Sequence, residues 1–269
     1  MSYKLICLDI DGTVLTDGKK VMPEVSQAVR EASDMGIQIA LASGRMPAGV
    51  DLVEKELGVQ CIKVCNAGTY VVLGDQCISA RHLLPRTMLT VYQEIANKNQ
   101  VPLWIFQERK WFVSSMDRYI EREIEIIRYR PEIVDVNRLA DQWAQEETGP
   151  NKLLIAVAPE KVRVIYEQMK KQALPEIDIA CSSESLIEIF PKGVTKGTAL
   201  IRICEKLNIS LEDTIAVGDQ ELDLPMIEAA GVGIAMGNAI EELKQKADYV
   251  TKSNNEAGVA HALWHYLKQ

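Results

Sequence analysis

Apolar runs alternate with amphipathic stretches in the N-terminal part of the chain. Leu5 to Leu8 is a continuous apolar run that ends in acidic residues, and further apolar runs cover 37–42 and 61–65. The stretch that starts at Pro23 and stops at Gly36 carries apolar residues at helical spacing. Continuous apolar runs indicate strands buried on both faces. Their order predicts a right-handed parallel sheet with helices packed on it.

The pattern changes in the middle of the chain, where short apolar stretches are interrupted by turn residues. Gly74-Asp75 and Glu108-Arg109-Lys110 each lie between two apolar stretches and predict hairpins. Helices are expected over about 85–97, 117–130 and 160–171, and further strands over 152–158, 177–181 and 186–190. Mixed hairpins and helices indicate an α+β module, which we place at 83–190.

The parallel pattern returns after residue 190. Helices are expected over 196–208, 222–230, 239–247 and from about 256, with strands over 214–217 and 232–236. The predicted fold class is therefore α/β, with a Rossmann-like parallel-sheet core and an inserted α+β domain. The core is predicted to comprise residues 1–82 and 191–269, and the insert residues 83–190.

Composition and charge narrow the classes of function. The chain has 269 residues, of which 47% are hydrophobic, and its net charge of −8 argues against binding to nucleic acid or anionic membrane surfaces. It has no apolar run as long as the ~20 residues of a membrane span and no secretory signal pattern, so we expect a cytoplasmic protein. The cysteines lack C-x-x-C spacing and are expected to be reduced core residues: Cys7, Cys61, Cys65, Cys77, Cys181 and Cys204.

Chemically capable residues follow three predicted parallel strands and open one helix. Asp9 and Asp11 end the first strand, Ser43-Gly44-Arg45 ends the second, and Gly218-Asp219 ends a later one, while Lys196 opens a helix. The carboxyl ends of parallel strands meet at one edge of the sheet, where ligands bind in open α/β folds. Carboxylates gathered there suit a hard divalent cation, and the start of a helix suits an anion.

In this order and spacing, the clusters resemble the motifs of the haloacid dehalogenase superfamily, in its branch of Cof-type phosphatases with a large α/β cap. The DxDGT motif stands as Asp9-Ile10-Asp11-Gly12-Thr13, the Ser/Thr motif as Ser43, the lysine motif as Lys196, and GDxxND as Gly218-Asp219-Gln220-Glu221-Leu222-Asp223. The resemblance covers the chain end to end, including a tail, Ser253 to Val259, similar to SNxxxGV. It implies a Mg²⁺-dependent phosphatase that hydrolyses small phosphomonoesters such as sugar phosphates, with the insert as a substrate-selecting cap.

The resemblance also implies catalytic and metal-binding roles. Asp9 would be the nucleophile that forms an aspartyl-phosphate, and Asp11 the general acid and then the base. Because two carboxylates so close together are costly to ionise at once, we expect one of them to stay protonated. Mg²⁺ would be held by Asp9, Asp219 and the backbone carbonyl of Asp11.

The phosphoryl oxygens would be held by Ser43, the N–H groups near Gly44, and Lys196. Asp223 would position Lys196 or a metal-bound water. Two further residues are candidate substrate contacts. Arg45 could equally face solvent, and Asn66 could equally cap a turn.

The chain departs from the family pattern at two places. Leu222 stands where the family usually has Asn, and Asn66-Ala67-Gly68 stands where it often has Asn-Gly-Ala. One lost amide hydrogen bond is worth about 0.5–1.5 kcal/mol, so we expect a working site with an altered rate or specificity.

Other interpretations of the chain remain open. The enzymatic alternative is a phosphomutase of the phosphomannomutase type, and the non-enzymatic alternative is a phospholigand-binding protein. The expected partner is a small phosphorylated metabolite, and the expected state is a monomer or homodimer. Trp104, Phe106 and Trp111 are expected to pack a hairpin, with a substrate platform as the alternative.

Overall fold

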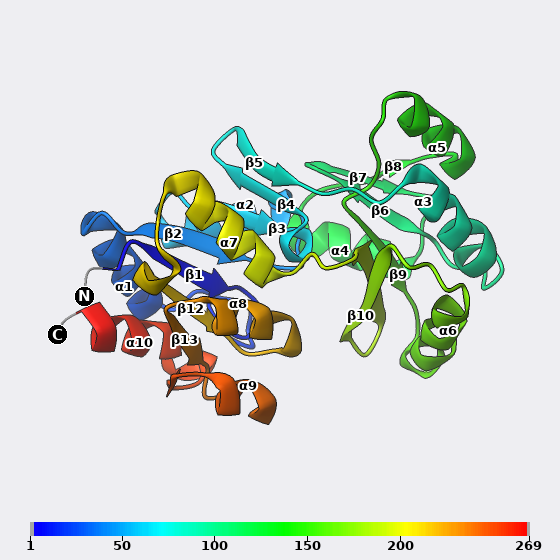
Figure 1. Ribbon diagram of the computed structural model, residues 1–269. Coiled ribbons are helices and arrows are strands. Elements are labelled where there is room, and N and C mark those ends of the chain that lie inside the picture. Colours follow the sequence, from blue (N-terminus) through cyan, green and yellow to red (C-terminus); the bar gives the residue numbers. More distant parts are fainter. Residues whose placement is uncertain (1–2, 268–269) are drawn as a thin grey trace. The chain divides into compact units, whose positions relative to one another are not determined.

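The computed structural model describes residues 3–267, which form two compact units (Figure 1). The core unit contains the described residues up to Ser79 and from Thr195 onward, and the inserted unit is Ala80–Val194. The chain therefore leaves the core unit once and returns to it once. Across residues 3–267, every helix falls short of the length and apolar character needed to cross a membrane.

Within residues 3–267, the core unit is built on an eight-stranded sheet in the order β14-β13-β12-β1-β2-β3-β4-β5. Neighbouring strands from β14 to β3 run parallel, and β4 is antiparallel to β3. The bounds are β1 (Leu5–Asp9), β2 (Gln38–Ala42), β3 (Ile62–Cys65), β4 (Tyr70–Leu73), β5 (Gln76–Ala80), β12 (Thr214–Gly218), β13 (Val232–Ala235) and β14 (Tyr249–Val250). The α/β class and the parallel sheet predicted from the sequence are confirmed.

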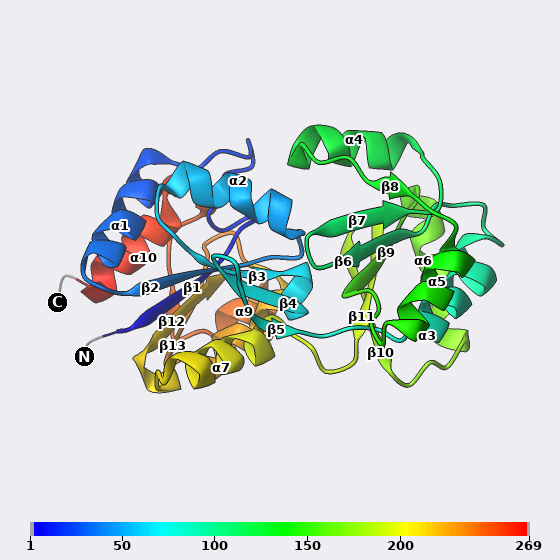
Figure 2. The ribbon, with the colours of Figure 1, turned by 90° about the horizontal axis from the view of Figure 1, so that it is seen from above.

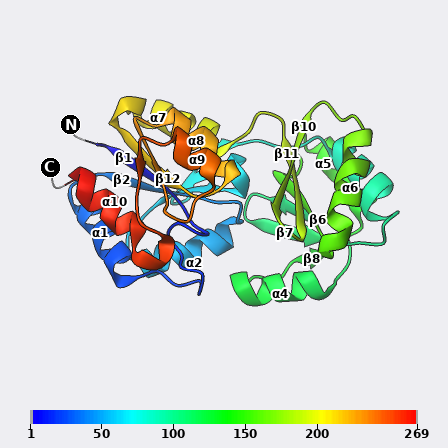
Figure 3. The same cartoon turned by 90° about the horizontal axis from the view of Figure 1, so that it is seen from below.

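Helices cover both faces of this sheet (Figures 2 and 3). One face carries α1 (Pro23–Asp34), α2 (Pro47–Leu57) and α10 (Gly258–Leu267), and the other carries α7 (Lys196–Leu207), α8 (Leu224–Ala229) and α9 (Glu241–Lys246). The apolar run of β1 is explained by this arrangement, since all four residues Leu5–Leu8 are 0% exposed.

The inserted unit, all of whose residues are described, has a six-stranded sheet in the order β10-β11-β9-β6-β7-β8. The helices at 85–91, 136–145 and 159–171 pack on one face, where Ile105, Leu153 and Ile187 of the sheet form a buried cluster with residues such as Met88 and Trp143. The helical bounds are α3 (Pro85–Val91), η2 (Tyr92–Ala96), α4 (Arg118–Ile127), α5 (Val136–Gln145) and α6 (Pro159–Lys171). The strand bounds are β6 (Trp104–Gln107), β7 (Lys110–Val113), β8 (Glu132–Ile133), β9 (Lys152–Ala156), β10 (Ile177–Ser183) and β11 (Leu186–Pro191).

The expectation that all six cysteines are core residues was partly wrong. All six lie within the described range and are thiols outside any disulfide, but Cys77 and Cys181 are exposed. Cys77 lies on β5 and Cys181 on β10, and each strand is the last in its sheet. A strand with a neighbour on one side only is less completely covered, and an apolar sequence run does not reveal whether its strand is central or at an edge.

Candidate active site

Polar residues from parallel strands gather at one edge of the core sheet. Asp9 is the last residue of β1 and pairs in register with Ala42, the last residue of β2, so Ser43 follows directly beside it. Asn66 follows β3, and Asp219 follows β12, the neighbour of β1 on its other side. Strand ends distant in the sequence are thereby brought to one place, as the parallel arrangement predicted.

A buried lysine joins two of the carboxylates. The Nζ of Lys196 donates to Oδ1 of Asp9 at 2.5 Å and to Oδ1 of Asp223 at 2.5 Å, and the three side chains are 5%, 7% and 1% exposed. Burial alone would lower the pKa of Lys196, but the charges of Asp223 and Asp9 outweigh it and raise the pKa above its usual value. Lys196 is therefore a fixed ammonium at neutral pH.

The start of helix α7 holds this lysine in place. Thr195 and Thr198 form a capping box in which each side chain accepts a hydrogen bond from the other's backbone N–H. Lys196 is the first residue of the helix. Its backbone position is thus fixed by the local hydrogen bonds between Thr195 and Thr198.

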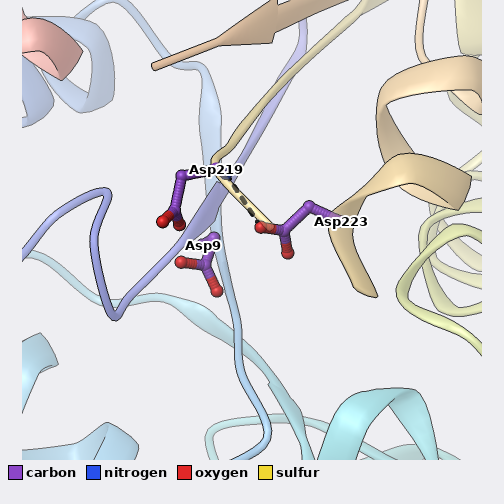
Figure 4. Close-up of side chains that lie close together, drawn as sticks. All are labelled: Asp9, Asp219 and Asp223. Atoms are coloured by element: carbon purple, nitrogen blue, oxygen red, sulfur yellow. Dashed lines mark hydrogen bonds between the residues drawn. The ribbon is translucent and has the colours of Figure 1, made fainter. Parts of the chain in front are cut away.

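Three carboxylates cluster where a cation could bind (Figure 4). One ligand oxygen from each of Asp9, Asp219 and Asp223 lies within 4.8 Å of the others, and this is the one such group of His, Cys, Asp or Glu found among residues 3–267. Burial, followed by the charge of Asp223, raises the pKa of Asp9 well above its usual value despite Lys196. Oδ2 of Asp9 is buried without a hydrogen-bond partner in the described chain. Three carboxylates thus share one ammonium, and a divalent metal ion would supply the missing positive charge.

Both carboxylate oxygens of Asp223 accept hydrogen bonds from other groups of the protein. Its Oδ2 accepts the backbone N–H groups of Asp219 at 2.9 Å and Gln220 at 3.0 Å, while its Oδ1 accepts Lys196. These contacts hold the turn after β12 against the lysine. They suit the positioning role that the resemblance implies for Asp223 better than direct ligation of a metal.

Hydrogen bonds from three side chains orient the carboxylate of Asp219. Thr13 donates to its Oδ1 at 3.2 Å, and Gln220 donates to its Oδ2 at 3.0 Å. Asn238 bridges the carbonyl oxygen of Gly12, at 2.9 Å, and Oδ2 of Asp219, at 3.5 Å. The sequence motifs did not single out these partners, although Thr13 and Gln220 stand inside them. An amide beside Asp219 is therefore present at position 220, two residues before Leu222.

Asp11 does not join the three clustered carboxylates within the described residues. Its carboxylate accepts two hydrogen bonds from Arg45, from Nε to Oδ2 and from Nη2 to Oδ1, both at 2.7 Å. Nζ of Lys19 also donates to Oδ1, at 2.8 Å. Burial by itself would raise the pKa of Asp11, but the hydrogen bonds and charges of Arg45 and Lys19 lower it to about 2. The expectation that one of Asp9 and Asp11 stays protonated agrees with the raised pKa of Asp9, although the causes are burial and Asp223 and not the nearness of Asp11. Asp11 itself is ionised, because two cations face it. The side chain of Arg45 is 16% exposed and paired with Asp11, so the solvent-facing alternative was wrong.

Replacing Asp11 with Asn should give a pH-dependent loss of stability. Because the folded pKa of about 2 lies below the ordinary aspartate pKa of 3.8, the unfolded chain binds more protons between these values. The contribution of ionised Asp11 is therefore fully present above about pH 4 and is lost as the pH falls towards about 2. Urea unfolding of both proteins from neutral to acidic pH measures the difference. A stability gap that stays constant as the pH falls would contradict the pairing.

The loops after β2 and β3 are joined by backbone hydrogen bonds. The N–H of Asn66 donates to the carbonyl of Arg45 and that of Ala67 to the carbonyl of Ser43, each at 2.9 Å. Ser43 is buried, and its Oγ accepts the N–H of Arg45 at 3.2 Å, with Gly44 partly buried between them. These hydrogen bonds therefore join the two loops into one unit at the sheet edge.

Asn66 has an unsatisfied and fully buried side chain. It is 0% exposed, and neither its Nδ2 nor its Oδ1 finds a hydrogen-bond partner among residues 3–267. An unsatisfied buried amide costs about 1–3 kcal/mol. The backbone is also unusual, since Asn66 and Ala67 have φ of 51° and 60°, in the left-handed region.

The order Asn-Ala-Gly follows from packing behind this loop. Gly68, with φ of 103°, lies so close to the carbonyl of Thr195 that a Cβ there would collide with it. Glycine is therefore required at position 68, and the left-handed conformation at position 67 is left to alanine.

Comparison with known proteins finds relatives that match this chain over almost its whole length. A family model described as haloacid dehalogenase-like hydrolase matches residues 6–263. The chain is 29% identical over 267 residues to 5-amino-6-(5-phospho-D-ribitylamino)uracil phosphatase YcsE of Bacillus subtilis (strain 168), covering 99% of this chain and 97% of that protein. It is 28% identical over 295 residues to phosphatase YwpJ of the same strain, covering 98% and 100%. A solved haloacid dehalogenase-like hydrolase from Bacteroides thetaiotaomicron has a TM-score of 0.87 and 26% identity, covering 98% of this chain and 99% of that one.

Proposed function

The chain belongs to the haloacid dehalogenase-like hydrolases, and on that premise we propose that it hydrolyses small phosphomonoesters through an aspartyl-phosphate on Asp9. It is a phosphoric monoester hydrolase, as its relatives YcsE and YwpJ are named phosphatases. One observation carries the proposed mechanism. Asp9 is held at Oδ1 by Lys196, while its buried Oδ2 has no hydrogen-bond partner in the described chain.

Asp9 would attack the phosphorus atom with its free oxygen. The new bond joins this oxygen to phosphorus, and the bond from phosphorus to the leaving alcohol breaks. Lys196 keeps the carboxylate oriented and places a fixed positive charge beside the transferring group. Water then hydrolyses the aspartyl-phosphate, which restores the Asp9 carboxylate and releases inorganic phosphate.

Asp11 is proposed to move the protons of both half-reactions. Its ionised form, held by Arg45 and Lys19, suits the second half, in which it takes a proton from the attacking water. To protonate the leaving alcohol in the first half-reaction, Asp11 has to release its contacts with Arg45 and Lys19 and bind a proton. We therefore assign Arg45 to holding Asp11 in place of the substrate contact expected from the sequence.

Mg²⁺ is the metal we propose for the carboxylate cluster, held by Asp9, Asp219 and the backbone carbonyl of Asp11. When bound, it would supply the positive charge that phosphoryl transfer requires. Asp219 is already oriented by Thr13 and Gln220, and Asp223 supports the turn that carries it. Ser43 and the N–H groups near Gly44, together with Lys196, are proposed to hold the phosphoryl oxygens.

The substrate is proposed to be a small cytoplasmic phosphometabolite, such as a sugar phosphate. The family resemblance supports this choice, and so does the net charge of −8, which disfavours nucleic acid. The inserted unit, Ala80–Val194, is proposed to select the leaving group.

A phosphate-release assay tests the proposed function. Purified protein with Mg²⁺ should release phosphate from an aryl phosphate and from some members of a panel of sugar phosphates. EDTA should abolish the release, and added Mg²⁺ should restore it. Formation of an isomeric hexose phosphate in the presence of a hexose bisphosphate would indicate a phosphomutase. Binding without turnover across the panel would indicate a phospholigand-binding protein.

A further inference from the structure

Asn66 stands apart from the other polar residues at the edge of the core sheet. Lys196, Asp223 and Asp219 all have protein partners, whereas both polar atoms of the Asn66 side chain are buried and lack one among the described residues. Buried side-chain amides are nearly always hydrogen-bonded in folded proteins. A buried amide without a hydrogen-bond partner in the protein indicates a partner that is not part of the polypeptide.

The position of Asn66 identifies the chemistry of that partner. Its N–H and that of Ala67 are bonded to the carbonyls of Arg45 and Ser43, so its loop is attached to one proposed phosphoryl-binding loop. Two residues later, Gly68 packs against the carbonyl of Thr195, the residue that caps the helix opened by Lys196. Asn66 therefore belongs to a loop that contacts both elements proposed to bind the phosphoryl group.

We infer that Asn66 is a substrate contact of this site, and that its Nδ2 donates a hydrogen bond to a phosphoryl oxygen. The inference rests on the proposed phosphatase function. A carboxamide offers two N–H donors, and phosphoryl oxygens are strong acceptors that carry no donor of their own when ionised. The left-handed φ of 51° at Asn66 agrees with this assignment, because strained backbone is often kept where it orients a group towards a ligand.

Asn66→Gly provides the test, since glycine adopts the left-handed backbone without strain. Without ligand, the variant should unfold at a temperature equal to or above that of the wild type, because an unsatisfied amide has been removed. With Mg²⁺ and inorganic phosphate, the variant should be stabilised less than the wild type. Its apparent affinity for phosphate should fall about tenfold or more, as expected when a hydrogen bond to a charged group is lost. The KM for an aryl phosphate should rise with it.

Ala67→Gly is the matched control. It changes the neighbouring residue, whose φ is 60°, and relieves backbone strain without removing the amide. It should raise the unfolding temperature and leave the response to phosphate as in the wild type. The inference is overturned if Asn66→Gly binds phosphate as tightly as Ala67→Gly does, or if it unfolds at a clearly lower temperature with unchanged KM.

The binding readout separates this inference from the proposed function. A wild-type protein that is stabilised by phosphate with Mg²⁺ but hydrolyses no ester would refute the phosphatase and still show whether Asn66 contacts phosphate. A wild-type protein that hydrolyses esters, with equal phosphate binding in both variants, would refute the role of Asn66 alone.

Discussion

Asp9→Asn is expected to abolish phosphate release while the protein stays folded. The amide is a poor nucleophile, and removing the nucleophile of a covalent mechanism costs on the order of 10⁴-fold or more in turnover. The site should otherwise keep its shape, because Asn can still accept a hydrogen bond from Lys196 at the position of Oδ1. The turnover number for an aryl phosphate with Mg²⁺ measures the effect, and circular dichroism checks the fold.

The same substitution should not destabilise the metal-free protein at neutral pH. Burial and the charge of Asp223 raise the pKa of Asp9, so the folded state disfavours its ionised form. A protein is destabilised as the pH rises past the unfolded pKa of an acid whose folded pKa is higher, and Asn at position 9 removes this destabilisation.

Asp51→Asn, on helix α2 of the same unit, is the control for Asp9→Asn and should retain activity. Substantial activity in Asp9→Asn would exclude Asp9 as the nucleophile.

Lys196→Met should damage both stability and turnover. Its ammonium is the buried partner of Asp9 and Asp223, whose side chains are 7% and 1% exposed. Breaking a buried ion pair by removing one partner costs about 3–5 kcal/mol, because the remaining charges are left unpaired. Turnover should fall by about 10²–10³-fold beyond any loss of folded protein, since a charge beside the transferring phosphoryl group is gone. Urea unfolding and kinetics on the folded protein measure the two effects separately.

Lys63→Met is the matched control for this prediction. Lys63 has a side chain that is 8% exposed and pairs with Asp51 at 2.5 Å and Glu54 at 2.7 Å. The Lys63→Met variant therefore loses a lysine–carboxylate ion pair on strand β3, similar to the one that Lys196→Met loses. Stability should fall, though less, because its partner carboxylates reach solvent. The folded variant should keep wild-type turnover, and a wild-type turnover number in Lys196→Met would contradict the role of Lys196.

Much of the fold could be predicted because it rests on local patterns. The apolar run of β1 and the Pro-to-Gly limits of the first helix correspond to elements in the structure. Helix α5 was not predicted, although Val136, Leu139, Ala140 and Trp143 are all buried at helical spacing. Asp135 caps this helix by accepting the N–H groups of Asn137 and Arg138, so the signal was present. Strand β8 spans only Glu132–Ile133, which is too short for any periodicity.

The site shows where prediction from sequence stops. The meeting of Asp9 and Asp219 follows from strand order, because parallel strands end at one edge. The environment of Asp11 does not follow from its nearness to Asp9 in the sequence. It depends on Arg45, a long side chain from another strand end, and on Lys19, a turn residue with φ of 57°. Rotamers of such side chains are set by tertiary contacts, which spacing along the chain does not record.

The strand order also has a consequence for biosynthesis. β1 is flanked by β2 and by β12, which is built from Thr214–Gly218. During translation, β1 therefore lacks its partner β12 on one side until the last fifth of this sequence has been synthesised. The inserted unit is synthesised before β12. An exposed apolar strand edge invites association with other nascent chains. Chaperone demand should accordingly be greatest for truncated products that end after the inserted unit and before β12.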